Sequence, residues 1–227
     1  YKWYQGTSMA CPHVAGVAAL VEALGVTDPN AVEGVLKSTA RSKGPEGREK
    51  GFGAGIVDAH RAANKAGYVY GIWRLALASV LALIPMLTII RRGYFLGLPV
   101  AKLGMIVGSS GFFFLPLVLG NPTMECQMLT QGMPSWSLAL FGAAYHGNPI
   151  FLSALIPVGL AILAVNSRML RALVSGLSIG FAAHLIFAAI SGCVTVMFVP
   201  ALLSRLWLVA NGLFCIFLSS VLAEESP

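Results

Sequence analysis

Acidic residues are almost absent from the second part of this chain. Between residues 71 and 222 the single Asp or Glu is Glu125, whereas seven Lys and Arg lie in the same stretch. Proton and ion pathways through a bilayer normally need ionisable groups inside the membrane, so this absence argues against a transporter. The basic residues flank long apolar stretches, where such residues usually mark the orientation of membrane spans.

Charge of either sign is scarce overall. Lys, Arg, Asp and Glu make up 11% of the 227 residues, and hydrophobic residues make up 57%. This composition is not that of an ordinary soluble domain. The net charge of +6 belongs mostly to the apolar part, and no soluble module with a basic face is evident, so we expect no nucleic-acid partner.

The sequence also lacks the spacing of a metal or cofactor site. No C-x-x-C pair occurs, so neither a zinc site nor a disulfide framework follows. The cysteines are Cys11, Cys126, Cys193 and Cys215. His146 and His184 are far apart in sequence, which leaves a metal pair only as an alternative. The glycine-rich GFGAG (51–55) lacks the strand–turn–helix context of a dinucleotide site. We therefore expect no cofactor and no metal.

Long apolar runs fill the second part and predict an α-helical transmembrane bundle of about five spans. They lie at about 71–90, 99–119, 149–165, 172–190 and 206–222. The positive-inside rule places most of the basic residues between them in the cytoplasm and residues 1–70 on the extracytoplasmic side. A sixth span at 135–147 is the alternative, but it is short, and we interpret it as interfacial.

Residues 1–67 form the first predicted unit and residues 68–227 the membrane domain. The run 9–24 is apolar on nearly every side, which is typical of a helix buried in a larger core. Asp28 predicts the start of a second helix. A glycine-rich turn and strand (51–57) should lead to a short helix that Asp58 caps and Gly67 ends. Because so few residues cannot cover the first helix, we expect covering strands upstream.

Ser8 stands at the start of that first helix, within GTSMA (6–10). A serine nucleophile needs a helix start, backbone N–H groups for the oxyanion and a base. This segment supplies the first two. Ala10 at its fifth position excludes the G-x-S-x-G elbow of α/β-hydrolases. Serine is also a favoured N-cap, so the residues alone leave a purely structural role open.

Two motifs carry a family resemblance. Gly6-Thr7-Ser8-Met9-Ala10-x-Pro12-His13-Val14-Ala15-Gly16 resembles the serine signature of the subtilisin-like serine proteases (subtilases). Gly53-x-Gly55-x-Val57-Asp58-Ala59, about forty residues later, resembles the pattern that closes their catalytic domain. The resemblance covers residues 1 to about 66.

The resemblance implies a fold and a role for Ser8. The fold would be the C-terminal portion of an α/β subtilisin-like catalytic domain. Ser8 falls on the nucleophile of the family, and its own backbone N–H would serve the oxyanion hole. His13 does not fall on the catalytic histidine. In the family the order is Asp, His, Ser, so the Asp, the His and the oxyanion Asn should precede Tyr1.

These expectations combine into one prediction. The chain is the C-terminal piece of a membrane-anchored serine endopeptidase that forms an acyl-enzyme at Ser8. Its partners would be a peptide or protein substrate and the lipid bilayer. The alternative is an inactive protease-like membrane receptor or scaffold that binds peptides. On its own, without base or orienting carboxylate, the fragment should be inactive.

Overall fold

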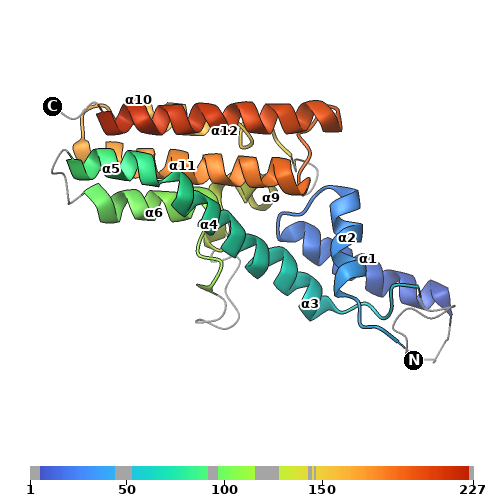
Figure 1. Cartoon of the computed structure of the whole chain (residues 1–227). Helices are drawn as coiled ribbons and strands as arrows, with labels where there is room; N and C mark the ends of the chain where they lie inside the picture. The colour runs from blue at the N-terminus through green and yellow to red at the C-terminus, as the bar shows by residue number, and fades with distance from the viewer. Residues whose placement is uncertain are drawn as a thin grey trace.

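The computed structural model describes residues 6–43, 53–91, 97–115, 128–142, 145 and 147–224. Within these ranges the chain is mostly helical. Figure 1 shows two long helices side by side, α11 (Arg168–Ser191) and α12 (Ala201–Glu224), with shorter helices packed beside them. The N-terminal helices lie at one end of this bundle, and the C-terminus lies at the other.

The predicted α/β fold of the first unit is wrong. The described residues contain no strand, and their extended pairing is one isolated antiparallel bridge between Arg41 and Ile56. The apolar segments form helices instead: α1 (Thr7–Ala23), α2 (Pro29–Thr39) and α3 (Ala59–Asn64). The predicted strand at 51–57 contributes only the Ile56 bridge among its described residues, and one paired residue cannot build a sheet.

Both predicted N-caps are confirmed. Asp28 precedes α2, and its carboxylate accepts hydrogen bonds from the backbone N–H groups of Asn30 and Ala31 at 3.0 and 3.1 Å. Asp58 precedes α3 and accepts from the N–H of Arg61 at 3.0 Å. Each bond satisfies an N–H that has no partner inside its helix.

Gly67 does not end the helix that Asp58 starts. The chain continues from α3 through the π-helical turn η1 (Lys65–Val69) into α4 (Tyr70–Leu81). Gly67 lies inside η1, where a Cβ would sit 3.5 Å from a methyl group of Leu24. The helical segments α3, η1 and α4 therefore continue across the predicted domain boundary at 67/68. Whether two domains meet there stays a prediction.

The prediction of about five spans is also wrong. Among the described residues, only α11 and α12 are long and apolar enough to cross a membrane, judged by length and composition. At 1.5 Å per residue, 24 residues extend about 36 Å, against a hydrocarbon core of about 30 Å.

The other apolar runs form shorter helices. Run 71–90 divides at Ala82 into α4 and α5 (Leu83–Arg91). Pro85 has no N–H to give the Leu81 carbonyl, which removes a helical hydrogen bond at this point. Two further helices have 13 and 10 residues: α6 (Gly97–Ser109) and α10 (Leu155–Ala164). The segment proposed as interfacial forms η2 (Met133–Ser135) and α9 (Trp136–Phe141).

Glycines bring α6 and α11 into backbone contact. A Cβ at Gly104 or Gly108 of α6 would overlap the carbonyl of Leu173 or Leu177 in α11. Conversely, Gly176 of α11 faces the backbone of α6 at equally close range. Two small-xxx-small motifs thus pack on each other, as such motifs do between membrane helices.

The N-terminal helices share a core with the end of the bundle. Its buried members from the first part are Val21, Val26, Val35, Ala62 and Ala66, and those from the second include Leu185, Ala188, Cys193 and Leu208. Hydrogen bonds reinforce the junction, because the N–H groups of Thr27 and Asp28 both donate to the Cys193 carbonyl, at 2.8 and 3.1 Å.

Candidate functional site

Ser8 lies in the first turn of α1, two residues after the N-cap residue Gly6. The side chain of Ser8 is exposed, and its hydroxyl donates to the Met9 sulfur at 3.4 Å. The first N–H groups of an α-helix have no carbonyl partner within the helix, so the Ser8 N–H remains available. These are the placement and the donor that a serine nucleophile requires.

No base accompanies Ser8 among the described residues. His13 is exposed on the same helix, five residues on. At 3.6 residues per turn these side chains point about 140° apart around the axis, so His13 cannot take the Ser8 proton. The role of Ser8 as a nucleophile therefore stays a prediction.

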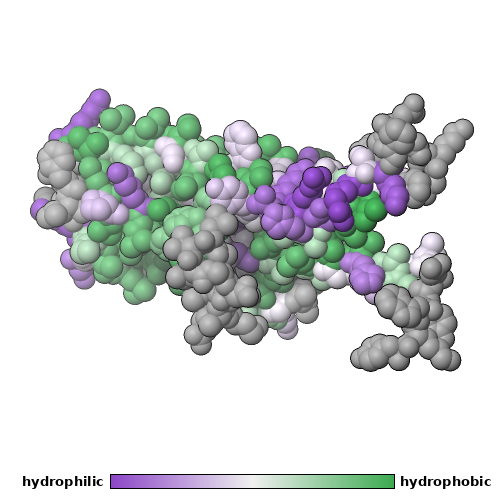
Figure 2. Space-filling view, turned by 90° about the horizontal axis from the view of Figure 1, so that it is seen from below, coloured by the Kyte–Doolittle hydropathy of each residue, from purple (hydrophilic) through white to green (hydrophobic). Residues whose placement is uncertain are grey.

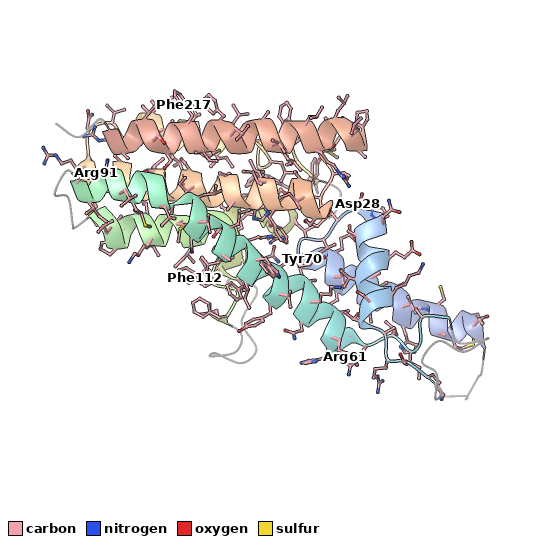
Figure 3. All side chains as sticks on the ribbon, in the orientation of Figure 1. Asp28, Arg61, Tyr70, Arg91, Phe112 and Phe217 are labelled. Atoms are coloured by element: carbon pink, nitrogen blue, oxygen red, sulfur yellow. The ribbon has the colours of Figure 1, made fainter. Side chains whose placement is uncertain are left out.

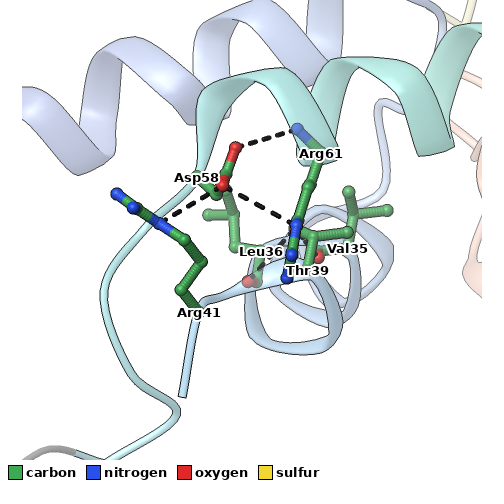
Figure 4. A network of polar contacts seen from close by, with 6 residues as sticks. All are labelled: Val35, Leu36, Thr39, Arg41, Asp58 and Arg61. Atoms are coloured by element: carbon green, nitrogen blue, oxygen red, sulfur yellow. Dashed lines mark hydrogen bonds and ion pairs between the residues drawn. The ribbon is translucent and has the colours of Figure 1, made fainter. Parts of the chain in front are cut away.

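The second motif forms a polar junction between α2 and α3 (Figure 4). The Asp58 carboxylate lies 3.3 Å from Nε of Arg41 and 3.8 Å from Nε of Arg61. The hydrogen bond from the Arg61 N–H, followed by the charges of these arginines, lowers the pKa of Asp58 below its usual value. Asp58 therefore stays ionised and ties the start of α3 to the segment after α2.

A glycine makes this junction possible. Gly55 has φ 113°, a conformation that side-chain-bearing residues rarely adopt, and a Cβ there would overlap the Arg41 carbonyl. The close approach allows Arg41 and Ile56 to exchange both hydrogen bonds of their bridge, at 2.8 and 2.9 Å. Glycine at position 55 and Asp at position 58 are thus explained by backbone contact and helix capping.

Much of α1 is uncovered. Val21 is the buried residue of this helix, whereas Met9, Val14 and Leu20 are more than two-fifths exposed. This exposure agrees with the expectation that the first unit alone cannot cover the helix, while burial by upstream sequence stays a prediction. The exposed apolar side chains form a surface on which further protein could pack.

A buried polar cluster in the second part of the chain was not predicted. Nδ1 of His184 lies 2.7 Å from the Ser109 carbonyl, and Nε2 lies 3.3 Å from the Ser135 hydroxyl. Because a carbonyl only accepts, Nδ1 carries the proton and Nε2 accepts from Ser135. The adjoining cavity has a volume of about 20 Å³, which is room for one water and not for a peptide. We assign this cluster a structural role.

Several other predicted candidates are placed by the structure. Cys11 is exposed, while Cys193 and Cys215 are buried as free thiols. Cys126 and His146 lie outside the described residues. Within the ranges given above, no three His, Cys, Asp or Glu side chains gather as metal ligands.

Comparison with known proteins separates two regions of the chain. A family profile described as Domain of unknown function (DUF5942) matches residues 69–226. The chain belongs to this family. A second profile, described as the Subtilase family, matches residues 1–55 and identifies that segment as subtilase sequence. No solved structure matches the chain.

Curated relatives match less than a third of this chain. An "Extracellular protease" of Xanthomonas campestris pv. campestris is 53% identical over 68 residues, covering 29% of this chain and 12% of the relative. An "Extracellular basic protease" of Dichelobacter nodosus is 44% identical over 70 residues, 28% of this chain and 11% of the relative.

A plant protein is also similar to part of this chain. "Subtilisin-like protease SBT4.12" of Arabidopsis thaliana is 41% identical over 76 residues, 31% of this chain and 10% of the relative. The chain thus spans about a tenth of the length of these curated relatives. Protease-type function is the general property that these names share.

Proposed function

We propose that the protein containing these residues is a membrane-anchored serine endopeptidase with Ser8 as its nucleophile. The observation that carries the proposal is the signature around Ser8, in a segment matched by the subtilase profile. Its exposed hydroxyl at the first turn of α1 supports this role. The catalytic Asp and His and the oxyanion Asn would come from sequence preceding residue 1, and the proposed partner is a peptide or protein substrate.

The proposed reaction follows from this placement. Oγ of Ser8 attacks the peptide carbonyl carbon while the histidine takes the hydroxyl proton of Ser8. The Ser8 N–H then donates a hydrogen bond to the oxyanion. The amine then leaves with that proton, and water hydrolyses the acyl-enzyme. Residues 6–10 supply the nucleophile and one oxyanion donor.

The proposed membrane position is supported by exposed apolar surface. α12 leaves most of its length uncovered, including the outward-pointing Phe217 labelled in Figure 3. Soluble proteins seldom expose so large a contiguous apolar area. In Figure 2 hydrophobic residues dominate the bundle, and hydrophilic residues gather toward its two ends.

Charge at the bundle ends suggests the orientation. Arg91 lies at the end away from α1–α3, whereas Asp28 lies at the opposite end (Figure 3). Arg168 and Arg171 begin α11, which runs toward the α1–α3 end. We propose that the end with Arg91, Arg168 and Arg171 (the arginine-bearing end) faces the cytoplasm and that α1–α3 lie on the extracytoplasmic side.

The test of the nucleophile uses a fluorophosphonate probe on the full-length protein. Ser8 should be labelled, and Ser8→Ala should abolish both labelling and peptidase activity. Ser38→Ala is the matched control, because it also removes an exposed helical serine, one whose hydroxyl bonds the Gly34 carbonyl. Activity that survives Ser8→Ala contradicts the proposal. A folded protein that is neither labelled nor active would instead be the inactive peptide-binding scaffold.

A further inference from the structure

A polar cavity of about 300 Å³ lies where the N-terminal helices meet the α11–α12 turn. Its walls are the start of α2, the end of α11 and the first turn of α12. The lining residues include Asp28, Asn30, Ser191, Gly192, Thr195 and Arg205. At about 30 Å³ per water, the space corresponds to roughly ten waters, so it is large enough for a small polar ligand.

Two opposite charges line this cavity without neutralising each other. Among the described residues, no ion pair joins Asp28 and Arg205. Oδ1 of Asp28 accepts the two capping hydrogen bonds, while no contact of Oδ2 with a described residue is recorded. The Arg205 guanidinium lies over Gly192, with Nη2 3.1 Å from the position that a Cβ would take. The cavity thus offers a cation and an anion at separate points of its wall.

Strongly exposed apolar residues adjoin three lining residues in the sequence. Ile190, Leu202 and Leu206, each next in sequence to a lining residue, are 74%, 75% and 60% exposed. Phe198, in the turn between α11 and α12, is 92% exposed and has φ 64°. Since α11 and α12 are the two helices long enough to span, their connecting turn would reach the headgroup level of a bilayer.

We propose that this cavity binds the headgroup of a phospholipid that carries both a phosphate and a primary ammonium group. Arg205 pairs with the phosphate, and Asp28 accepts a hydrogen bond from the ammonium. The acyl chains run along the exposed apolar side chains named above. A choline headgroup has no N–H to donate and is bound by aromatic cages, whereas none of the described residues that line this cavity is aromatic. The inference rests on the proposed membrane position and not on the peptidase activity.

The chemistry predicts a two-part selectivity. Native mass spectrometry of the detergent-purified full-length protein should show phosphatidylethanolamine retained about tenfold better than phosphatidylcholine with the same acyl chains, the difference expected for a hydrogen bond to a charged group. Arg205→Gln should reduce retention of both phosphatidylethanolamine and phosphatidic acid. Asp28→Asn keeps an N-cap side chain and should abolish only the preference for phosphatidylethanolamine over phosphatidic acid. Arg91→Gln, which removes one charge at the other end of the bundle, is the control.

Three results would overturn the inference. They are equal retention of the choline lipid, preference for phosphatidic acid in the unaltered protein, and no loss with Arg205→Gln. Displacement of the lipid by free glycerophosphoethanolamine at equal concentration would identify a soluble ligand instead. Carbonate extraction of membranes distinguishes failure of the membrane position from failure of the lipid inference. If carbonate releases the protein, the membrane position is refuted as well. If the protein stays in the membrane but shows no lipid preference, only this inference is refuted.

Discussion

Gly176 of α11 packs directly against the main-chain carbonyl of Ala101 in α6. A Cβ at Gly176 would overlap that carbonyl, and Gly180 meets the Met105 carbonyl one turn further on in the same way. The axes of α6 and α11 can approach this closely because neither glycine carries a side chain. This contact fixes α11 at the centre of the bundle, where most of its residues are buried.

Gly176→Ala should therefore push α6 and α11 apart. Overpacking of this kind costs about 1–3 kcal/mol, so the thermal midpoint of the detergent-purified protein should fall. Gly159→Ala is the matched control, since Gly159 lies in α10 and a Cβ there would meet nothing within 4 Å. Equal midpoints for the two variants would show that the glycine contact does not hold the helices together.

Gly55→Ala should disrupt the junction between α2 and α3. It forces an alanine into φ 113° and against the Arg41 carbonyl, and a residue held in such a conformation costs about 1–3 kcal/mol. Gly34→Ala should have the opposite sign, because Gly34 is an exposed glycine inside α2 with open space around it. Replacing glycine there gains about 0.5–1 kcal/mol. Limited proteolysis within residues 53–66 at increasing denaturant concentrations would measure both changes in stability.

The ionised Asp58 predicts a pH dependence for the start of α3. Its pKa is lower in the folded protein, so its contribution is present above the unfolded value of about 3.9 and is lost as pH falls through the folded pKa. Hydrogen exchange of residues 59–64 should be slower in the unaltered protein than in Asp58→Asn at neutral pH. That difference should shrink as the pH falls further and further below about 3.9. A difference that persists there would show that the charge is not its cause.

Local features of this fold were predictable from the sequence, and contacts distant in sequence were not. Asp28 and Asp58 cap helices through bonds to N–H groups two or three residues on, so neighbouring residues determine them. The contact between Ser135 and His184 joins residues 49 positions apart, and no spacing pattern marks it. A buried histidine in an apolar run was the available signal.

Apolar composition also misled the prediction of the membrane spans. It identifies the run 71–90 as long enough to span, although Pro85 follows closely on the break at Ala82. The Ser8 motif and the later glycine–Asp pattern indicated the subtilase resemblance. The α/β architecture that this resemblance implied does not occur in the described residues.

The proposed orientation places Cys11 and the start of α11 on opposite sides of the membrane. Cys11 is exposed on α1, while Ser167 is the N-cap of α11 at the arginine-bearing end. A membrane-impermeant maleimide applied to intact cells should label Cys11 and should not label Ser167→Cys, each tested as the single cysteine of its variant. A permeant maleimide should label both, which shows that each thiol is reactive. Because K/R bias governs orientation, the reverse pattern would place α1–α3 and Ser8 in the cytoplasm and would contradict the proposal of an extracytoplasmic peptidase.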